Sequence, residues 1–233
     1  MWQTIGERLN LRASVTGALS TVLFLSLMCS MSIQHGHADT PIAATADEIR
    51  PLQVGQSAPR FTVQTVDHKP FEFDPRSLER PVLLIAFRGG WCPFCNMYLS
   101  ELRNVIDEVD ALGVDVLFLS GDRPELLYRS LSQETQEDIA NLNYRILSDA
   151  DAQATIAFGT AFKASQKVFD WLNQNDKDII KSSMLQHGVL PVPSVFAIDK
   201  SGIIAFQYAN PDYKVRMPTE ELLQVAAEIA AAK

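Results

Sequence analysis

Two apolar runs separated by one amphipathic segment constrain the fold of this chain more than any other feature of its sequence. Residues 81–87 are entirely apolar and residues 114–119 nearly so, as is typical of strands buried on both faces of a parallel sheet. Between them, residues 93–112 carry apolar side chains at helical spacing and end at Gly113. A strand, a helix and a strand in this order form a right-handed crossover between parallel strands. The sequence therefore predicts an α/β fold.

The rest of the chain predicts elements that extend this unit. Residues 61–64 and 71–73 alternate apolar with polar side chains around Asp67-His68-Lys69, which indicates an antiparallel hairpin at a sheet edge. The same criteria predict helices at residues 124–135, 152–158, 168–172 and 220–232, a strand at 144–147, and a hairpin of strands 194–198 and 203–208. We therefore expect a central mixed sheet flanked by helices, with an N-terminal β-hairpin extension.

The charge balance excludes one class of partner. The formal net charge is -8 at pH 7, and the isoelectric point is about 5.0. Such a chain offers no basic surface to neutralise phosphates, so nucleic acid is not expected as a partner, nor are anionic membrane surfaces.

The N-terminal segment has the organisation of a secretory signal peptide. Residues 13–34 carry no charged side chain, Arg8 and Arg12 precede them, and Gly36-His37-Ala38 follows. A positive region, an apolar region and a small-x-small site in this order predict cleavage after residue 38 and export of the rest, to the periplasm or another extracytoplasmic space. The alternative is an uncleaved membrane anchor. We expect a flexible tether over residues 39–53 and one domain over residues 54–233.

Two cysteines carry the chemistry expected of this domain. Cys92 and Cys95 follow the apolar run 81–87, and sites in α/β sheets form at the carboxyl ends of strands. Pro93 is placed to be the first helical residue, so Cys92 is the N-cap, where free backbone amides and the helix dipole stabilise a thiolate. Cys92 is therefore the predicted nucleophile. Cys95 lies one helical turn further on, within bonding reach of a sulfenic acid or mixed disulfide formed on Cys92.

Other uses of two cysteines at this spacing are weaker. A structural zinc site would need four ligands, and the sequence has no second Cys pair or matching His pair. Covalent haem attachment would need His after Cys95, where Asn96 stands. A copper-binding module that uses both thiols and His187 remains an alternative. A purely structural disulfide would constrain the unfolded chain only weakly, because its loop is so short.

From about residue 54 onward, the chain resembles the peroxiredoxin-like branch of the alkyl hydroperoxide reductase and thiol-specific antioxidant family, within the thioredoxin superfamily. The resemblance rests on five short motifs: Val54-Gly55-x-x-Ala58-Pro59-x-Phe61, Gly89-Gly90-Trp91-Cys92-Pro93-x-Cys95, Ser148-Asp149, Pro193 with Asp199-x-x-Gly202, and Asn210-Pro211-Asp212-Tyr213. The resemblance implies a thioredoxin-like fold.

The resemblance also implies an activity. Cys92 would attack the O–O bond of hydrogen peroxide or an organic hydroperoxide, become a sulfenic acid, and condense with Cys95 to a disulfide that a thioredoxin-type protein reduces. No cofactor or metal is implied. Arg88, Trp91 and Pro193 are the expected substrate-binding residues. The Thr or Ser of a typical peroxiredoxin is replaced by Gly89, so Arg88 is the nearest candidate to polarise the peroxide.

One further alternative shares the same two cysteines. The two-residue spacing and Pro193, which matches the proline that faces the disulfide in thioredoxins, are also typical of an exported thiol-disulfide oxidoreductase that acts on proteins. A peroxide and a model disulfide, tested separately, would distinguish the two activities.

Overall fold

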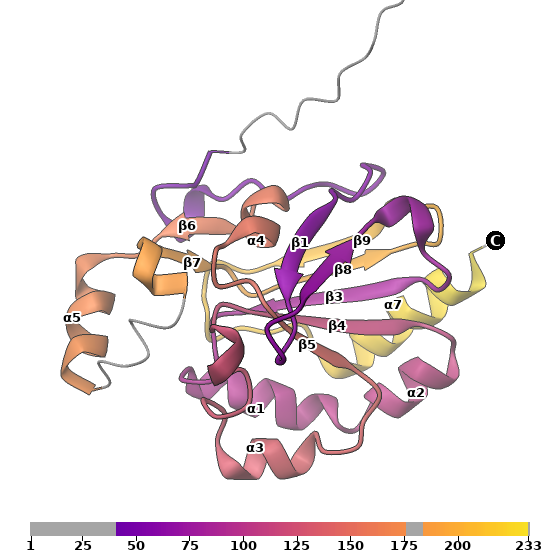
Figure 1. Ribbon diagram of the computed structural model, residues 1–233. Coiled ribbons are helices and arrows are strands. Elements are labelled where there is room, and N and C mark those ends of the chain that lie inside the picture. The colour runs from indigo at the N-terminus through magenta and orange to yellow at the C-terminus, as the bar shows by residue number, and fades with distance from the viewer. Residues whose placement is uncertain (1–40, 176–183, 233) are drawn as a thin grey trace, which may run out of the picture. The chain divides into compact units, whose positions relative to one another are not determined.

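The computed structural model describes residues 41–175 and 184–232 (Figure 1). The signal peptide that we predict over residues 1–38 lies outside these residues. No helix in the two described ranges is long and apolar enough to cross a bilayer.

A seven-stranded mixed sheet forms the centre of the described domain, in the order β2-β1-β5-β4-β3-β8-β9. Its strands are β1 (Phe61–Gln64), β2 (Pro70–Phe73), β3 (Val82–Phe87), β4 (Asp115–Ser120), β5 (Arg145–Ser148), β8 (Ser194–Ile198) and β9 (Ile204–Ala209). Strands β3, β4 and β5 run parallel, whereas β8 is antiparallel to β3. The predicted parallel pair and the hairpin at the sheet edge are confirmed.

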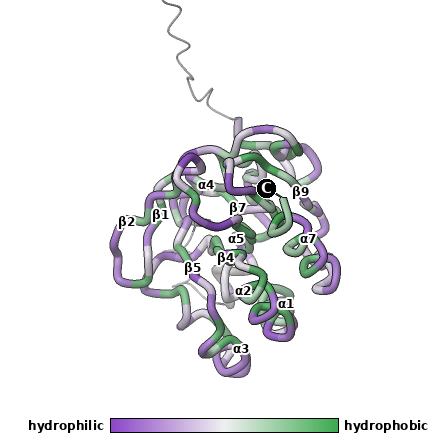
Figure 2. The backbone as a smooth tube through the Cα atoms, turned by 90° about the vertical axis from the view of Figure 1, so that its right-hand side faces the viewer, coloured by the Kyte–Doolittle hydropathy of each residue, from purple (hydrophilic) through white to green (hydrophobic). Residues whose placement is uncertain are grey.

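Helices cover both faces of this sheet. The helices of the described residues are α1 (Pro93–Leu102), α2 (Ile106–Ala111), α3 (Gln133–Asp138), α4 (Gln153–Ala157), α5 (Gln166–Asn175) and α7 (Thr219–Ala231), with 3-10 turns η1 (Ala46–Glu48), η2 (Pro75–Ser77), η3 (Pro124–Leu126) and η4 (Met184–His187). Figure 1 shows α1, α2 and α7 on one face and α4 on the other. Figure 2 shows green and purple alternating along α1, α2 and α7, as in helices with one buried face.

Strand β3 contributes to two hydrophobic cores because its side chains alternate between the two faces of the sheet. Leu83, Ile85 and Phe87 pack with side chains of α1, α2 and α7. Leu84 and Ala86 pack on the opposite face, with side chains of β1 and α4. All six residues of β3 are buried, so the apolar run was correctly interpreted as a strand buried on both faces.

The helix expected over residues 93–112 is two helices, because the chain turns at residues 103–105. At that point the side-chain Nδ2 of Asn104 donates to the carbonyl oxygen of Glu101 at 3.0 Å. An asparagine that bonds to the backbone in this way competes with helical hydrogen bonds. The helix expected over residues 124–135 was also wrong: η3 occupies its first part, and α3 begins only after Ser132, whose side chain accepts from the backbone N–H of Thr135.

Residues 41–53, the described part of the segment where we expect a flexible tether, form backbone hydrogen bonds with the domain. The backbone N–H of Ala43 donates to Ala161 O at 3.2 Å, and the N–H of Leu52 donates to Phe158 O at 3.1 Å. Ile42 and Leu52 also pack against buried side chains. The partner strand β6 (Ala161–Lys163) pairs with β7 (Val189–Pro191) in a two-stranded sheet that was not predicted, because such short strands show no periodicity.

Candidate active site

The two cysteines lie where the buried strand β3 is followed by helix α1. Cys92 is the N-cap residue of α1 with extended backbone angles, and Pro93 occupies the first turn. Both cysteines are free thiols, and Cys92 is only 2% exposed and Cys95 only 1%. This arrangement agrees with the local geometry expected from the sequence.

The environment of Cys92 favours its thiolate. Its pKa is lowered to about 6, first by the hydrogen bond from the Cys95 thiol, against the opposing effect of burial, and then by the Cys95 backbone amide, Arg88 and Arg216. The Cys95 backbone amide lowers this pKa less than the Cys95 thiol does, so helix amides alone do not explain the lowered pKa. The sequence predicts that helix amides lower this pKa, whereas in the structure the second cysteine is the main cause.

The environment of Cys95 favours its neutral thiol. Burial raises the pKa of Cys95 well above its ordinary value, and the neighbouring Cys92 raises it further. Arg216 acts in the opposite direction: its Nη2 donates to Cys95 Sγ at 3.4 Å. The two sulfurs therefore have different charge states at neutral pH: Cys92 is ionised, and Cys95 keeps its proton.

Arg88 is a buried cation beside these sulfurs. Its side chain is 7% exposed, and its guanidinium lies 4.6 Å from the ring centroid of Tyr213 and 5.6 Å from that of Trp91. Burial lowers its pKa, while the charges of Cys92 and Cys95 raise it. No carboxylate of the described residues forms a salt bridge with Arg88. Its positive charge is therefore directed at the thiolate and at anything that approaches it.

Cys92 opens onto a cleft of about 520 Å³. Most of the lining is aromatic or aliphatic, with two cationic side chains at its margin: Arg88, Trp91, Cys92, Pro93, Phe94, Lys167, Val168, Trp171 and Tyr213. Helix α5 supplies three of these residues, and Tyr213 comes from the segment between β9 and α7. A cleft of this size is typical of small-molecule sites. Trp91 lines this cleft together with Cys92.

Asp122 holds the loop that carries Cys92, a role that sequence reasoning missed. It is fully buried and accepts from the backbone N–H of Gly90 at 2.8 Å and from Ser130 Oγ at 2.7 Å. Burial raises the pKa of Asp122 to about 6, and these hydrogen bonds oppose that effect. The only sequence signal was its position just after an apolar strand, at the edge of the sheet where parallel strands end.

Gly89 is required by this packing. Its φ is +146°, and a Cβ atom there would lie 2.6 Å from Asp122 Oδ1 and 2.5 Å from Trp91 Nε1. Any larger residue would displace one of these groups. The loop therefore excludes the hydroxyl side chain that a typical peroxiredoxin carries at this position. Arg88, the cation closest in sequence to Cys92, remains the candidate to polarise a peroxide.

Pro193 lines a pocket with Cys95 and not with Cys92. It lines a small pocket with Cys95, Tyr98, Ser194 and Arg216, so it neighbours the second cysteine and does not line the cleft outside Cys92. A role in contacting a small substrate in that cleft is therefore not supported.

His187 lies away from the cysteines. Its Nε2 is 3.2 Å from Asp151 Oδ1, and the described residues include no group of three His, Cys, Asp or Glu side chains placed to hold a metal ion. The copper-binding alternative needed His187 beside both thiols, and the structure does not bring them together.

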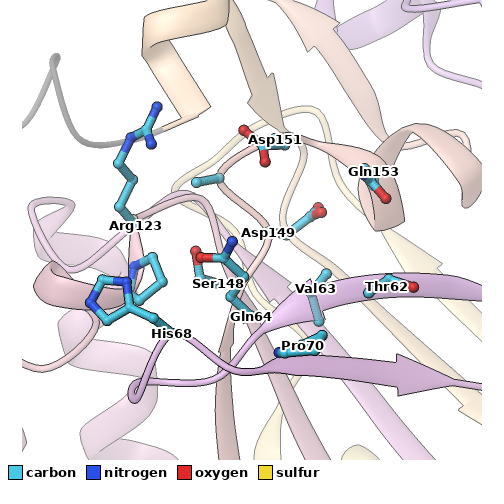
Figure 3. Close-up of a pocket in the computed structure, with 12 residues that line it drawn as sticks. Thr62, Val63, Gln64, His68, Pro70, Arg123, Ser148, Asp149, Asp151 and Gln153 are labelled. Carbon is cyan, nitrogen blue, oxygen red and sulfur yellow. The ribbon is translucent and has the colours of Figure 1, made fainter.

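A second pocket, of about 200 Å³, lies among polar side chains near Asp151. Figure 3 shows Asp149, Asp151 and Gln153 on one side and His68 and Arg123 on another. Asp149 already accepts hydrogen bonds from the backbone amides of residues 154 and 155 at the start of α4. Asp149 is therefore occupied by hydrogen bonds of the fold, and neither Cys92 nor Cys95 lines this pocket.

Comparison with known proteins agrees with this geometry. Residues 54–207 match the AhpC/TSA family. The chain belongs to this family. Peroxiredoxin Bcp of Escherichia coli (strain K12) is 33% identical over 111 residues, which is 48% of this chain and 67% of that protein. Thiol-disulfide oxidoreductase ResA of Bacillus anthracis is 23% identical over 166 residues, 71% of this chain and 75% of that protein.

Solved structures support the same fold. The peroxiredoxin-like protein from Aquifex aeolicus superposes with a TM-score of 0.59 at 20% identity, covering 77% of this chain and 89% of that one. Peroxidoxin BcpB from Mycobacterium tuberculosis gives a TM-score of 0.54 at 16% identity, covering 76% and 98%. As an AhpC/TSA family member with a thioredoxin-like fold, the protein is a peroxidase-type thiol oxidoreductase.

Proposed function

We propose that this protein reduces hydroperoxides with Cys92 as the attacking sulfur and Cys95 as the resolving sulfur. The observation that carries the proposal is a buried Cys92 with a lowered pKa, placed at a cleft beside the cationic Arg88. The family membership supports the same reaction class.

The proposed chemistry has three balanced steps. The Cys92 thiolate attacks the terminal oxygen of ROOH, the O–O bond breaks, and RO⁻ leaves and takes up a proton, so that Cys92 becomes a sulfenic acid. Cys95 then attacks the Cys92 sulfur, and the hydroxide that leaves is protonated to water. A dithiol reductant of the thioredoxin type reduces the resulting disulfide and is itself oxidised.

The cleft supports organic hydroperoxides as substrates in addition to hydrogen peroxide. Its volume of about 520 Å³ far exceeds what hydrogen peroxide fills, and the lining residues are mainly apolar. Trp171 lines this cleft from helix α5, where a large R group would lie. Replacing Trp171 by Ala is expected to raise KM for a bulky hydroperoxide while leaving KM for hydrogen peroxide unchanged.

The test is a single-turnover reaction of the reduced protein with hydrogen peroxide and with an organic hydroperoxide. We expect one hydroperoxide consumed for each Cys92–Cys95 pair and catalytic turnover with thioredoxin. Cys92→Ser is expected to abolish the reaction, whereas Cys95→Ser should permit one turnover and block recycling. A reduced wild-type protein that consumes neither hydroperoxide would overturn the proposal.

A second candidate is a thiol-disulfide oxidoreductase acting on proteins. Pro193 beside Cys95 and the similarity to ResA favour it. Insulin reduction, or a mixed disulfide with a protein trapped on the Cys95→Ser variant, would support this activity. If a model disulfide reacts faster than either hydroperoxide, the second candidate replaces the first.

We also propose that the protein is exported, on the evidence of the uncharged residues 13–34 and the arginines before them. N-terminal sequencing of the protein purified from its native host tests this: a first residue at or near position 39 is expected. A mature chain that retains the segment in a membrane fraction would instead identify an uncleaved anchor.

A further inference from the structure

Arg216 contacts the second cysteine directly, although the two residues are 121 positions apart in the sequence. It lies between β9 and α7, and its Nη2 donates to Cys95 Sγ at 3.4 Å. Its Nη1 donates to the backbone carbonyl oxygens of Tyr213 and Val215. These carbonyl contacts orient the guanidinium with one nitrogen aimed at the sulfur.

The charge of Arg216 is not neutralised by a carboxylate. Within residues 41–175 and 184–232, no Asp or Glu forms a salt bridge with it. No described carboxylate therefore offsets the charge of Arg216 next to the buried thiol, where the low dielectric makes the interaction stronger than in water.

Two further hydrogen-bond donors line the same small pocket. The hydroxyl groups of Tyr98 and Ser194 are buried and have no hydrogen-bond partner in the described part of the chain. Both residues line the pocket with Cys95 and Arg216. At about 10 Å³, the pocket has room for about one water molecule, so it is not a substrate site. Its donors are of the kind that stabilise an anion.

We propose that Arg216 is a catalytic residue that stabilises the Cys95 thiolate, both when Cys95 attacks Cys92 and when it leaves during reduction. This inference rests on the proposed function, in which Cys95 resolves the oxidised Cys92. Tyr98 and Ser194 assist by presenting hydroxyl donors to the same pocket.

The need for such a group follows from the position of Cys95. The thiol is buried, and burial together with the adjacent Cys92 disfavours its ionised form. Yet the attacking species in disulfide formation is a thiolate. Arg216 offsets part of the cost of ionising Cys95 because it contacts that sulfur, whereas the charge of Arg88 acts mainly on Cys92.

The same interaction serves both directions of the cycle. In resolution, Cys95 S⁻ forms a bond to the Cys92 sulfur, the S–O bond breaks, and the departing hydroxide takes up a proton. In reduction, a reductant thiolate forms a bond to the Cys92 sulfur, the Cys92–Cys95 bond breaks, and its electron pair goes to Cys95. A leaving thiolate with a lower pKa leaves faster, so Arg216 accelerates this step as well.

The first experiment follows disulfide formation in the Arg216→Met protein. After rapid oxidation with one equivalent of hydroperoxide, sulfenic acid is trapped with dimedone and the disulfide is quantified by mass spectrometry. Since Arg216 is the smallest of the named causes of the lowered Cys92 pKa, we expect sulfenic acid formation to slow much less than disulfide formation. The rate of disulfide formation should fall about tenfold or more, with its pH profile displaced to higher pH. Arg216→Lys should restore part of the rate.

A matched control removes one positive charge elsewhere. Arg129 is exposed and lines neither the cleft nor the small pocket, so Arg129→Met should leave the disulfide step unchanged. Near-ultraviolet circular dichroism confirms that each variant is folded. A folded Arg216→Met protein with the wild-type rate and pH profile of disulfide formation would overturn the inference.

A second experiment does not depend on peroxidase activity. The pKa of Cys95 is measured by alkylation in Cys92→Ser and in Cys92→Ser/Arg216→Met, and we expect it to be higher by about one or more in the double variant. If the wild-type protein consumes no hydroperoxide but this difference is found, the proposed function fails and Arg216 still stabilises the Cys95 thiolate. If the two values are equal, the inference about Arg216 fails.

Discussion

Removing the second cysteine should change the ionisation of the first. The main cause of the lowered Cys92 pKa is the hydrogen bond from the Cys95 thiol. Cys95→Ala deletes this donor, whereas Cys95→Ser keeps an O–H donor at almost the same place. The two substitutions therefore separate the effect of the donor from the effect of the second sulfur.

The expected rise in the Cys92 pKa follows from the strength of the hydrogen bond that Cys95→Ala removes. A hydrogen bond to a charged group contributes about 1.5–3 kcal/mol, and about 1.4 kcal/mol corresponds to one pKa unit. The Cys92 pKa of about 6 should therefore rise by about 1–2 in Cys95→Ala. At pH 7, the thiolate fraction falls from about nine-tenths to between about a half and a tenth. Cys95→Ser should stay much closer to the wild-type value.

The assay is the pH dependence of the alkylation rate at Cys92. Peptide mass spectrometry follows the Cys92 peptide alone, so Cys29 does not contribute to the signal. If Cys95→Ala leaves the Cys92 pKa at about 6, the thiol donor does not lower the Cys92 pKa, and the reasoning fails. Arg88→Met then tests whether the guanidinium has the main effect instead.

Two further predictions concern the loop that carries Cys92. Gly90→Ala would place a Cβ atom 2.6 Å from the carbonyl carbon of Ser130 and 2.7 Å from the backbone nitrogen of Leu131, so we expect a loss of about 3 kcal/mol or more in the free energy of unfolding; a variant as stable as wild type in urea would contradict this. The pKa of Asp122 is raised from 3.8 to about 6, so the protonated Asp122 carboxyl stabilises the folded state. This contribution to the free energy of unfolding, up to about 3 kcal/mol, is fully present below about pH 4 and is lost as pH rises through about 6. Asp122→Asn should remove that part of the pH dependence in urea unfolding at pH 4 and pH 7, and an unchanged dependence would show that Asp122 is not its source.

Several elements followed from the sequence because their information is local. The apolar run before Arg88 predicted β3, alternation predicted the β1–β2 hairpin, and helical spacing predicted α7. The sequence predictions of helices and strands failed where a single side chain or a distant partner determined the local structure. The Asn104 side chain bonds to the backbone where α1 ends, and the strand-like pairing of Ala43 depends on β6, more than a hundred residues away.

The candidate site likewise has features that follow from the local sequence and features that depend on tertiary packing. The sequence alone determined the pairing of Cys92 with Cys95 at the start of a helix, because residues three apart on a helix share one face whatever the rest of the chain does. Only the tertiary structure decided which charges surround the two sulfurs. Arg216 and Asp122 reach the site from segments 121 and 32 residues away from their partners, and no local pattern encodes which distant residues packing brings together.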